Sequence, residues 1–93
     1  MTYELGFLGV ALKEWRKLDA TVREQFKSKL AERLQDPRVP SAKLSGHSDR
    51  YKIKLRSAGF RLVYEVRDRQ LIVIVVAVGK RERNAVYKAA AKR

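Results

Sequence analysis

Residues 51–66 read YKIKLRSAGFRLVYEV, and this stretch decides the fold. Apolar residues alternate with polar or basic ones on both sides of a Ser-Ala-Gly turn at 57–59, which is the period of a strand with one buried face. Two such strands so close in sequence form a hairpin, and a slip of one residue would mix cations into the core. The register that avoids this pairs Leu55 with Phe60, Ile53 with Leu62, and Lys54 with Arg61.

The first half of the chain predicts a short strand followed by two helices. Residues 3–7 alternate between apolar and smaller or polar side chains, and apolar residues recur at helical spacing over 8–18 and again over 21–34. Trp15 lies on the apolar side of the first helix, so we interpret it as a core residue. Proline, glycine and short polar residues over 36–49 indicate a loop.

Residues 71–78, LIVIVVAV, are apolar on both faces, as in a strand buried from both sides. The two helices can cover one side. Strict alternation places four residues on the other side: Ile72, Ile74, Val76 and Val78. Only residues 82–93 remain to cover this second side, and their apolar side chains are few and small. We therefore expect either a loosely held C-terminal helix or a partner protein that replaces it.

The expected fold class is α+β: a small antiparallel β-sheet of about four strands, with an N-terminal helical hairpin packed on one face and a short C-terminal helix. No linker or repeat divides the chain, so we expect a single domain over residues 1–93. The longest apolar run is too short to span a membrane, which predicts a cytoplasmic protein. Without cysteine and with one histidine, no cysteine-based or histidine-pair metal site can form, and we expect neither metal nor cofactor.

The charge distribution points to a polyanionic partner. The chain carries 22 Lys+Arg against 10 Asp+Glu, a net charge of +12. Residues 50–93 hold thirteen basic and three acidic residues, so they contribute +10 of that charge. Such a concentration of charge makes nucleic acid the leading partner, followed by an acidic membrane surface or an acidic protein.

The outward side of the hairpin presents a row of cations: Lys52, Lys54, Arg56 and Arg61. If the third strand pairs with the second, the chain leaves it through 79–83, GKRER, near the hairpin turn. One groove could then contain Lys52, Lys54, Arg61, Arg81 and Tyr87. The same spacing also fits a solvated basic face that binds phosphate without specificity.

A basic groove of this kind can be compared with the needs of metal-free RNA cleavage. The substrate 2′-hydroxyl attacks the adjacent phosphate, which requires a proton acceptor, a proton donor for the leaving 5′-oxygen, and cations for the developing charge. Here a lysine would have to be the base. Two lysines about 7 Å apart repel by about 2.4 kcal/mol at an effective dielectric of about 20, which lowers a lysine pKa from about 10.4 to about 8.7. We expect slow cleavage of free RNA and a partner that positions the substrate.

Three stretches resemble the RelE toxins of the RelE/ParE toxin–antitoxin superfamily: ALKEWRKLDATVREQFKSKL, YKIKLRSAGFRLVYEV and VGKRERNAVYKAAAKR. The similarity extends over nearly the whole chain and implies the RelE-like microbial RNase fold. It also implies a toxin of a type II toxin–antitoxin system, a ribosome-dependent and metal-independent endoribonuclease that inhibits translation. Such toxins cut mRNA in the ribosomal A site by 2′-hydroxyl attack, leaving a 2′,3′-cyclic phosphate and a 5′-hydroxyl.

The resemblance also implies roles for individual residues. Lys52 and Lys54 serve as base and charge stabilisers, Arg61 stabilises the transition state, Arg81 is the acid, and Tyr87 stacks on a codon base. We further expect three cations to contact RNA phosphates: Arg56, Lys80 and Arg83. The implied partners are a RelB-like antitoxin that displaces the C-terminal helix, mRNA, and the bacterial ribosome with the ribosomal RNA that lines the A site of its small subunit; no membrane is implied.

Two other functions remain open. A ParE-like toxin would poison DNA gyrase by binding, and a noncatalytic basic module would bind RNA with steep salt dependence and no cut product. The lysine strand with Arg81 and Tyr87 favours the nuclease. We interpret His47, in the loop before the hairpin, as a surface histidine.

Overall fold

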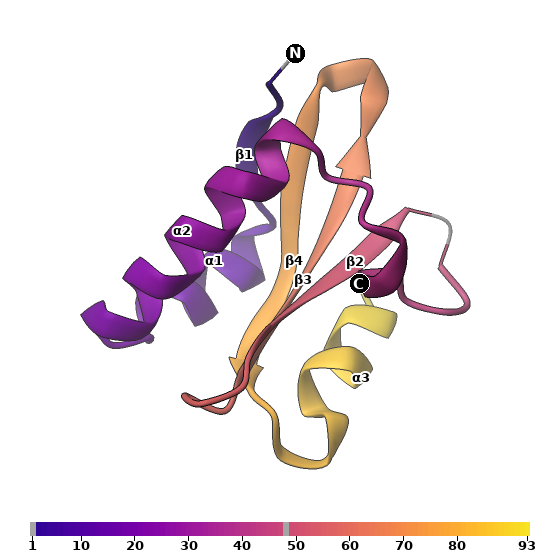
Figure 1. The fold of residues 1–93 in the computed structure, drawn as a ribbon. Helices are drawn as coiled ribbons and strands as arrows, with labels where there is room; N and C mark the ends of the chain where they lie inside the picture. Colours follow the sequence, from indigo (N-terminus) through magenta and orange to yellow (C-terminus); the bar gives the residue numbers. More distant parts are fainter. Residues whose placement is uncertain (1, 48) are drawn as a thin grey trace.

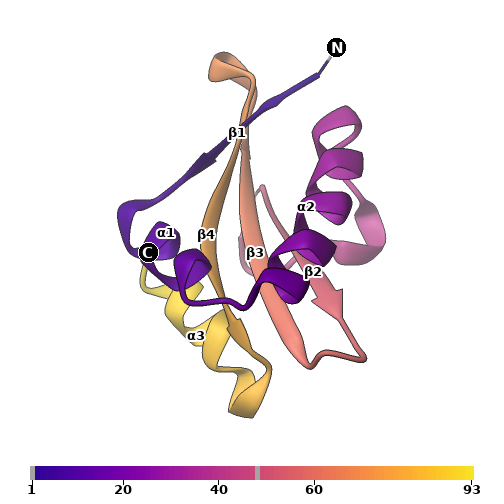
Figure 2. The ribbon, with the colours of Figure 1, turned by 90° about the vertical axis from the view of Figure 1, so that its left-hand side faces the viewer.

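The computed structural model describes residues 2–47 and 49–93 and has the expected α+β fold. Strands β1 (Glu4–Phe7), β2 (Arg50–Leu55), β3 (Phe60–Arg67) and β4 (Ile72–Lys80) form one sheet in the order β1-β4-β3-β2. Helices α1 (Gly9–Arg16) and α2 (Ala20–Gln35) cover one face, and α3 (Ala85–Ala91) covers part of the other (Figures 1 and 2). Within the described residues, every helix is too short or too polar to cross a bilayer.

The β2–β3 hairpin has the register that its alternation predicts. Leu55 pairs with Phe60, Ile53 with Leu62, and Lys54 with Arg61, so the prediction is confirmed. The antiparallel description needs one correction, because β1 pairs with β4 in parallel and the sheet is therefore mixed. Since a long connection through α1, α2 and the hairpin separates β1 from β4, no tight turn forces these two strands to be antiparallel.

A β-bulge in β4 overturns the strict alternation expected for residues 71–78. Val63 pairs with Ala77 but Tyr64 pairs with Val75, so Val76 is an extra residue in β4. An extra residue reverses which side chains face each way beyond it. Val78 therefore packs on the helical-hairpin side, where alternation had not placed it, while Val76 and Ala77 both pack on the α3 side.

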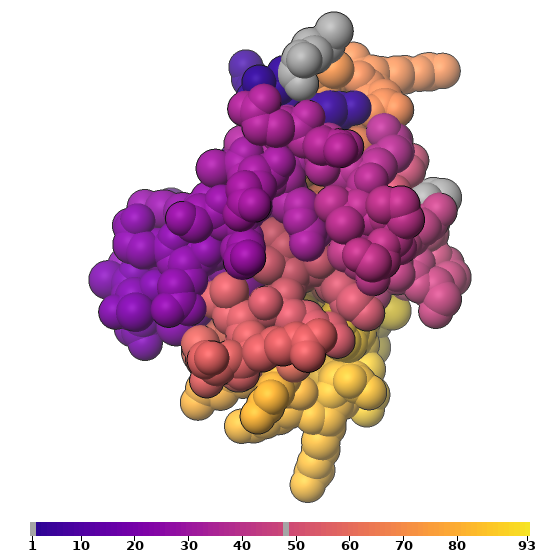
Figure 3. Space-filling view, viewed as in Figure 1, coloured from indigo at the N-terminus to yellow at the C-terminus, as the bar shows by residue number. Residues whose placement is uncertain are grey.

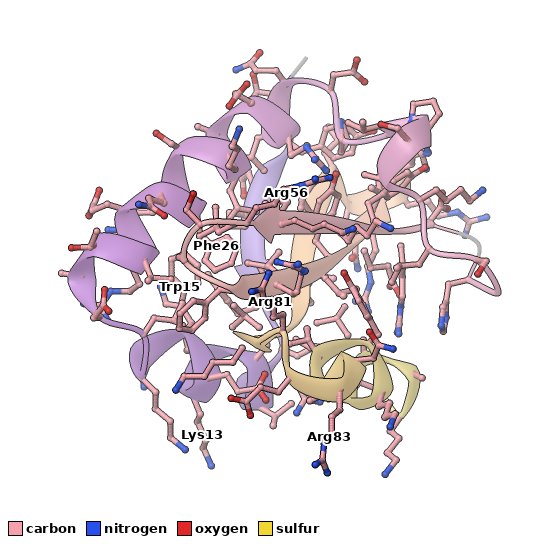
Figure 4. The ribbon with its side chains drawn as sticks, turned by 60° about the horizontal axis from the view of Figure 1, so that its bottom comes forward. Lys13, Trp15, Phe26, Arg56, Arg81 and Arg83 are labelled. Atoms are coloured by element: carbon pink, nitrogen blue, oxygen red, sulfur yellow. The ribbon has the colours of Figure 1, made fainter. Side chains whose placement is uncertain are left out.

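The face under α1 and α2 holds the larger core. Trp15 is 8% exposed and Phe26 fully buried, and their ring centroids lie 6.3 Å apart, which confirms Trp15 as a core residue (Figure 4). Asp19 caps α2 by accepting a hydrogen bond from the Val22 N–H at 2.9 Å. The apolar side of this helix packs on the sheet.

A partly buried hydrogen-bond network fastens α2 to the hairpin. The Arg33 guanidinium donates to the Tyr64 hydroxyl at 2.8 Å and to the Lys52 carbonyl at 3.2 Å. Tyr64 in turn donates to the Pro37 carbonyl at 2.6 Å and stacks on Tyr51 with ring centroids 5.7 Å apart. Burial of the Tyr64 phenol raises its pKa, so it stays a neutral donor. The network holds the backbone of Lys52 in place.

The α3 side has a smaller apolar core, but arginines anchor the helix. Among the described residues its buried cluster consists of Val63, Val76, Ala77, Val86 and Ala90. The Arg93 guanidinium pairs with both Glu14 carboxylate oxygens, at 2.9 and 3.1 Å, and donates to the Val76 carbonyl at 2.9 Å. Arg50 donates to the Ala90 carbonyl at 2.6 Å. The C-terminal helix is thus present in the fold, with polar anchors that the sequence did not predict.

Candidate catalytic and RNA-binding face

The edge strand β2 presents the predicted lysines on the α3 side of the sheet. Lys52 lies opposite Val63, which belongs to the cluster under α3, and Lys54 lies opposite Arg61. Because α3 packs on β3 and β4, strand β2 lies beside the helix rather than under it (Figure 2). Lys54 is exposed, whereas Lys52 and Arg61 are half-buried. Three of the predicted catalytic side chains therefore share one face.

Lys54 is the residue whose proton affinity this cluster changes. Its pKa is lowered first by the charge of Lys52, then by partial desolvation, and then by Arg56 and Arg61. This agrees in direction with the repulsion expected from the spacing of the two lysines. A lowered pKa increases the neutral fraction of the amine near neutral pH, which a general base requires.

Arg81 joins this cluster from the end of β4. Its backbone N–H donates to the Gly59 carbonyl at 3.0 Å, which ties the segment after β4 to the hairpin turn. Its side chain also lies against that turn, since a Cβ built on Gly59 would be 3.6 Å from Arg81 Nε (Figure 4). In Figure 3 the hairpin and the segment after β4 lie side by side on the surface. Arg81 and Arg61 are therefore at the same end of the sheet.

Tyr87 approaches the lysines from the other side. It lies on α3 and shares with Lys52 a surface hollow of about 370 Å³, which is also lined by Lys43, Leu44, Ser45 and His47. The Tyr87 hydroxyl is buried without a hydrogen-bond partner among the described residues. Unpaired buried hydroxyls are uncommon in folded proteins.

The three predicted phosphate contacts have different surroundings. Arg56 is exposed next to Lys54 and contributes to lowering its pKa. Lys80 pairs with Phe60, which packs on the helical-hairpin side of the sheet. Lys80 is therefore on the other face of the sheet from Lys52 and Lys54. Arg83 has a left-handed backbone, with φ at 48°, and points away from the sheet into solvent (Figure 4). The structure groups only Arg56 with the predicted catalytic residues.

The carboxylate of Glu65, on β3, is already engaged. Glu65 accepts hydrogen bonds from Arg50 at 3.0 Å and from Arg67 at 2.8 Å. Burial raises its pKa, but the hydrogen bonds from Arg67 and Arg50 outweigh this and hold the pKa below its ordinary value. A carboxylate paired in this way is a weak base, so lysine remains the better proton acceptor on this face.

Sequence reasoning missed the residues that hold the site in place. Arg33 and Arg50 fasten the first half of β2, and Glu14 anchors α3 through Arg93. Nothing in the periodicity distinguishes these charged residues from solvated ones. His47 was also missed as a member of the hollow beside Lys52, because a loop residue carries no periodic signal at all.

This fold and its basic face match a known class of protein. The family model described as the ParE toxin of type II toxin-antitoxin system, parDE, matches residues 7–85. The Escherichia coli (strain K12) protein named mRNA interferase toxin RelE is 59% identical over 93 residues, which is 100% of this chain and 98% of that protein. The chain belongs to the RelE toxins of the RelE/ParE superfamily.

Solved structures agree with this assignment. A form of E. coli toxin RelE carrying R81A and R83A, in the free state, superposes with a TM-score of 0.92 at 57% identity, covering 100% of this chain and 98% of that one. The toxin in the intact E. coli RelBE toxin-antitoxin complex gives a TM-score of 0.83 at 59% identity, covering 87% of this chain and 99% of that one.

Proposed function

We propose that this chain is the toxin of a type II toxin–antitoxin system and acts as a ribosome-dependent, metal-independent mRNA endoribonuclease in the cytoplasm. It inhibits translation by cutting the message in the ribosomal A site, leaving a 2′,3′-cyclic phosphate and a 5′-hydroxyl. The observation that carries this proposal is the cluster of Lys52, Lys54 and Arg61 on one face of the β2–β3 hairpin, in which the pKa of Lys54 is lowered. The 59% identity to a named mRNA interferase supports it.

The cluster suggests a separate catalytic role for each of its members. Lys54 in its neutral form takes the proton of the 2′-hydroxyl, and Lys52 with Arg61 stabilises the negative charge that develops on the phosphate. Arg81, held at the hairpin turn, donates a proton to the leaving 5′-oxygen. Tyr87 stacks on a base of the codon. Arg56 is placed to contact a neighbouring phosphate, with Lys80 and Arg83 as more distant cationic contacts.

The ribosome is the proposed positioning partner. The site is an open face, and the charged groups that shift the pKa of Lys54 are all cations: Lys52, Arg56 and Arg61. Proton transfer by a lysine that is mostly charged is slow, so fixing the message in a reactive geometry has to supply much of the acceleration. The basic half would contact two polyanions: the message itself, and the ribosomal RNA that lines the A site of the small subunit.

A RelB-like antitoxin is the proposed inhibitor. A solved E. coli complex contains RelE with its antitoxin RelB, and that toxin is 59% identical to this chain. The small apolar cluster under α3 fits this proposal, because an apolar segment of a partner could replace the helix. Loss of α3 would remove Tyr87 from the site.

Gyrase poisoning is the second candidate, because the matching family model is named for ParE. Programmed ribosomes separate the two functions. Wild-type protein is expected to cut the message within the A-site codon, and the Arg81→Ala variant is expected to be about 10²–10³-fold slower, as when one stabilising donor is removed. An intact message together with arrested gyrase would reject the nuclease.

The end groups of the product provide the control. Attack by the 2′-hydroxyl leaves a 2′,3′-cyclic phosphate, whereas a contaminating nuclease of another mechanism leaves different ends. Lys13→Gln removes an exposed cation of α1 and should cut at the wild-type rate (Figure 4).

A further inference from the structure

The only histidine in the sequence lies beside the proposed site. His47 is half-buried in the loop that precedes β2, and it lines the hollow that contains Lys52 and Tyr87. In Figure 1 this loop runs next to the C-terminal end of α3. His47 also lines a second hollow of about 340 Å³, bounded by Asp49, Arg50, Glu65 and Arg93 among other residues. It therefore sits on the wall between the RNA face and the anchors of α3.

The carboxylates around His47 already have arginine partners. Asp49 accepts from Arg38 at 3.2 Å, and Glu65 accepts from both Arg50 and Arg67. The fourth charged group of that hollow, Arg93, is paired with Glu14. In the hollow shared with Tyr87, the charged neighbours of His47 are the cations Lys43 and Lys52, and the Tyr87 phenol is a neutral neighbour. A protonated imidazole here would be stabilised best by an anion from outside the protein.

The hollow shared with Tyr87 has the composition of a nucleotide site. Tyr87 supplies an aromatic ring for stacking, and Lys43 and Lys52 supply charges for phosphate. An imidazole adds a group that can donate or accept a hydrogen bond when neutral and that adds a positive charge when protonated. The hollow therefore brings an aromatic ring, two lysines and an imidazole together within reach of one nucleotide.

We propose that His47 is an RNA-contacting residue of this hollow, where its imidazolium pairs with a phosphate of the message next to the nucleotide that stacks on Tyr87. This inference rests on the proposed nuclease function and extends it to a residue outside the lysine strand. A nearby phosphate favours the charged form of an imidazole, so RNA binding and proton uptake by His47 are coupled. RNA binding should therefore be tighter when the imidazole carries its proton, which acidic pH favours.

Cleavage kinetics on programmed ribosomes test the proposal. The KM of the wild-type protein is divided by that of His47→Gln at each pH. This KM ratio should rise about threefold to tenfold between about pH 5.5 and pH 7.5, whereas the ratio of the two kcat values should stay constant. His47→Lys should keep the low KM across the range, because its charge does not titrate there. A purely structural role for His47 would not give opposite effects for Gln and Lys. If His47→Gln matches the wild type in KM at every pH while both proteins cut, the proposal is overturned.

A second measurement does not depend on cleavage. Because the chain has one histidine, its ring signals in an NMR spectrum belong to His47. The midpoint of their pH titration is measured with and without a saturating 2′-O-methyl RNA hexanucleotide, which cannot be cut by 2′-hydroxyl attack. An upward shift of the midpoint supports the contact, and an unchanged midpoint and ring shift overturn it.

The two measurements separate the possible failures. A shifted histidine midpoint with no cleavage by the wild type would reject the nuclease and leave the RNA contact standing. Cleavage by the wild type with an unchanged histidine midpoint would support the nuclease and reject the RNA contact of His47. Lys13→Gln, which removes one exposed cation on α1, is the matched control for loss of charge and should leave both readouts unchanged.

Discussion

The two faces of the sheet are built in different ways. Under α1 and α2, sixteen buried apolar residues of the described part of the chain, including Trp15, Phe26 and Tyr64, form one core. Under α3 the described residues contribute only five buried ones, and the largest of these are valines. The helix on this side depends on arginine contacts from Arg50 and Arg93.

This difference explains where a basic site can form. Burying large apolar side chains stabilises the helical-hairpin side by about 25 cal/mol for each Å² removed from water. That side can therefore carry the stability of the domain. The α3 side can leave β2 uncovered and place mutually repelling cations there, at a cost that the other side offsets.

The strongest test of this contrast is a pair of core truncations. Phe26→Ala should lower the free energy of unfolding by about 3–5 kcal/mol, because it leaves a large cavity in the main core. Val86→Ala should cost only about 1–2 kcal/mol, because it removes little apolar area from the thin α3 side. Chemical denaturation of both variants measures the difference. Equal losses in the free energy of unfolding would mean that the two faces contribute equally to stability.

A second test removes a cation rather than a core residue. Lys54→Met should lower the cleavage rate about 10²–10⁴-fold, the usual contribution of a general base. Thermal stability should stay the same or rise slightly, because the charges of Lys52, Arg56 and Arg61 act against that of Lys54. A loss of stability parallel to the loss of activity would mean that the lysine is structural.

A third test releases the anchor of α3. Glu14→Gln should weaken α3 docking by about 1 kcal/mol, since a neutral amide replaces a bidentate ion pair with Arg93. Hydrogen exchange should accelerate in α3 and stay unchanged in α2. Glu24→Gln is the matched control, because its pair with Lys27 is exposed and such pairs contribute about 0.3–0.5 kcal/mol. Equal acceleration in both variants would contradict the anchor.

The smallest expected effect is an acid dependence confined to α3. The pKa of Glu65 is held below its ordinary 4.5. A depressed carboxyl pKa contributes stability above the unfolded-state value, and this is lost as the pH falls through the folded-state value. As the pH falls through the lowered folded-state pKa of Glu65, Arg50 loses its paired carboxylate, and α3 should become less protected from hydrogen exchange by less than about 1 kcal/mol. Glu65→Gln should remove the dependence, whereas a uniform acid response of all helices would contradict it.

Part of the proposed site was predictable because one hairpin carries three of its residues. Lys52, Lys54 and Arg61 lie together because alternation and the short turn allow one register, which the structure confirms. The approach of Arg81 also follows from that hairpin, since β4 returns to its turn. His47 could not be placed in this way, because it lies in a loop with no repeating pattern.

The sequence by itself determined the α+β class, the hairpin register, the two amphipathic helices and the excess of positive charge near the C-terminal end. All of these depend on residues close together in the chain, where sterics and side-chain periodicity act locally. Only the tertiary structure decided the parallel β1, the bulge at Val76 and the anchor between Glu14 and Arg93, which are 79 positions apart. Such features depend on which distant groups meet once the cores have packed, and no local pattern encodes that.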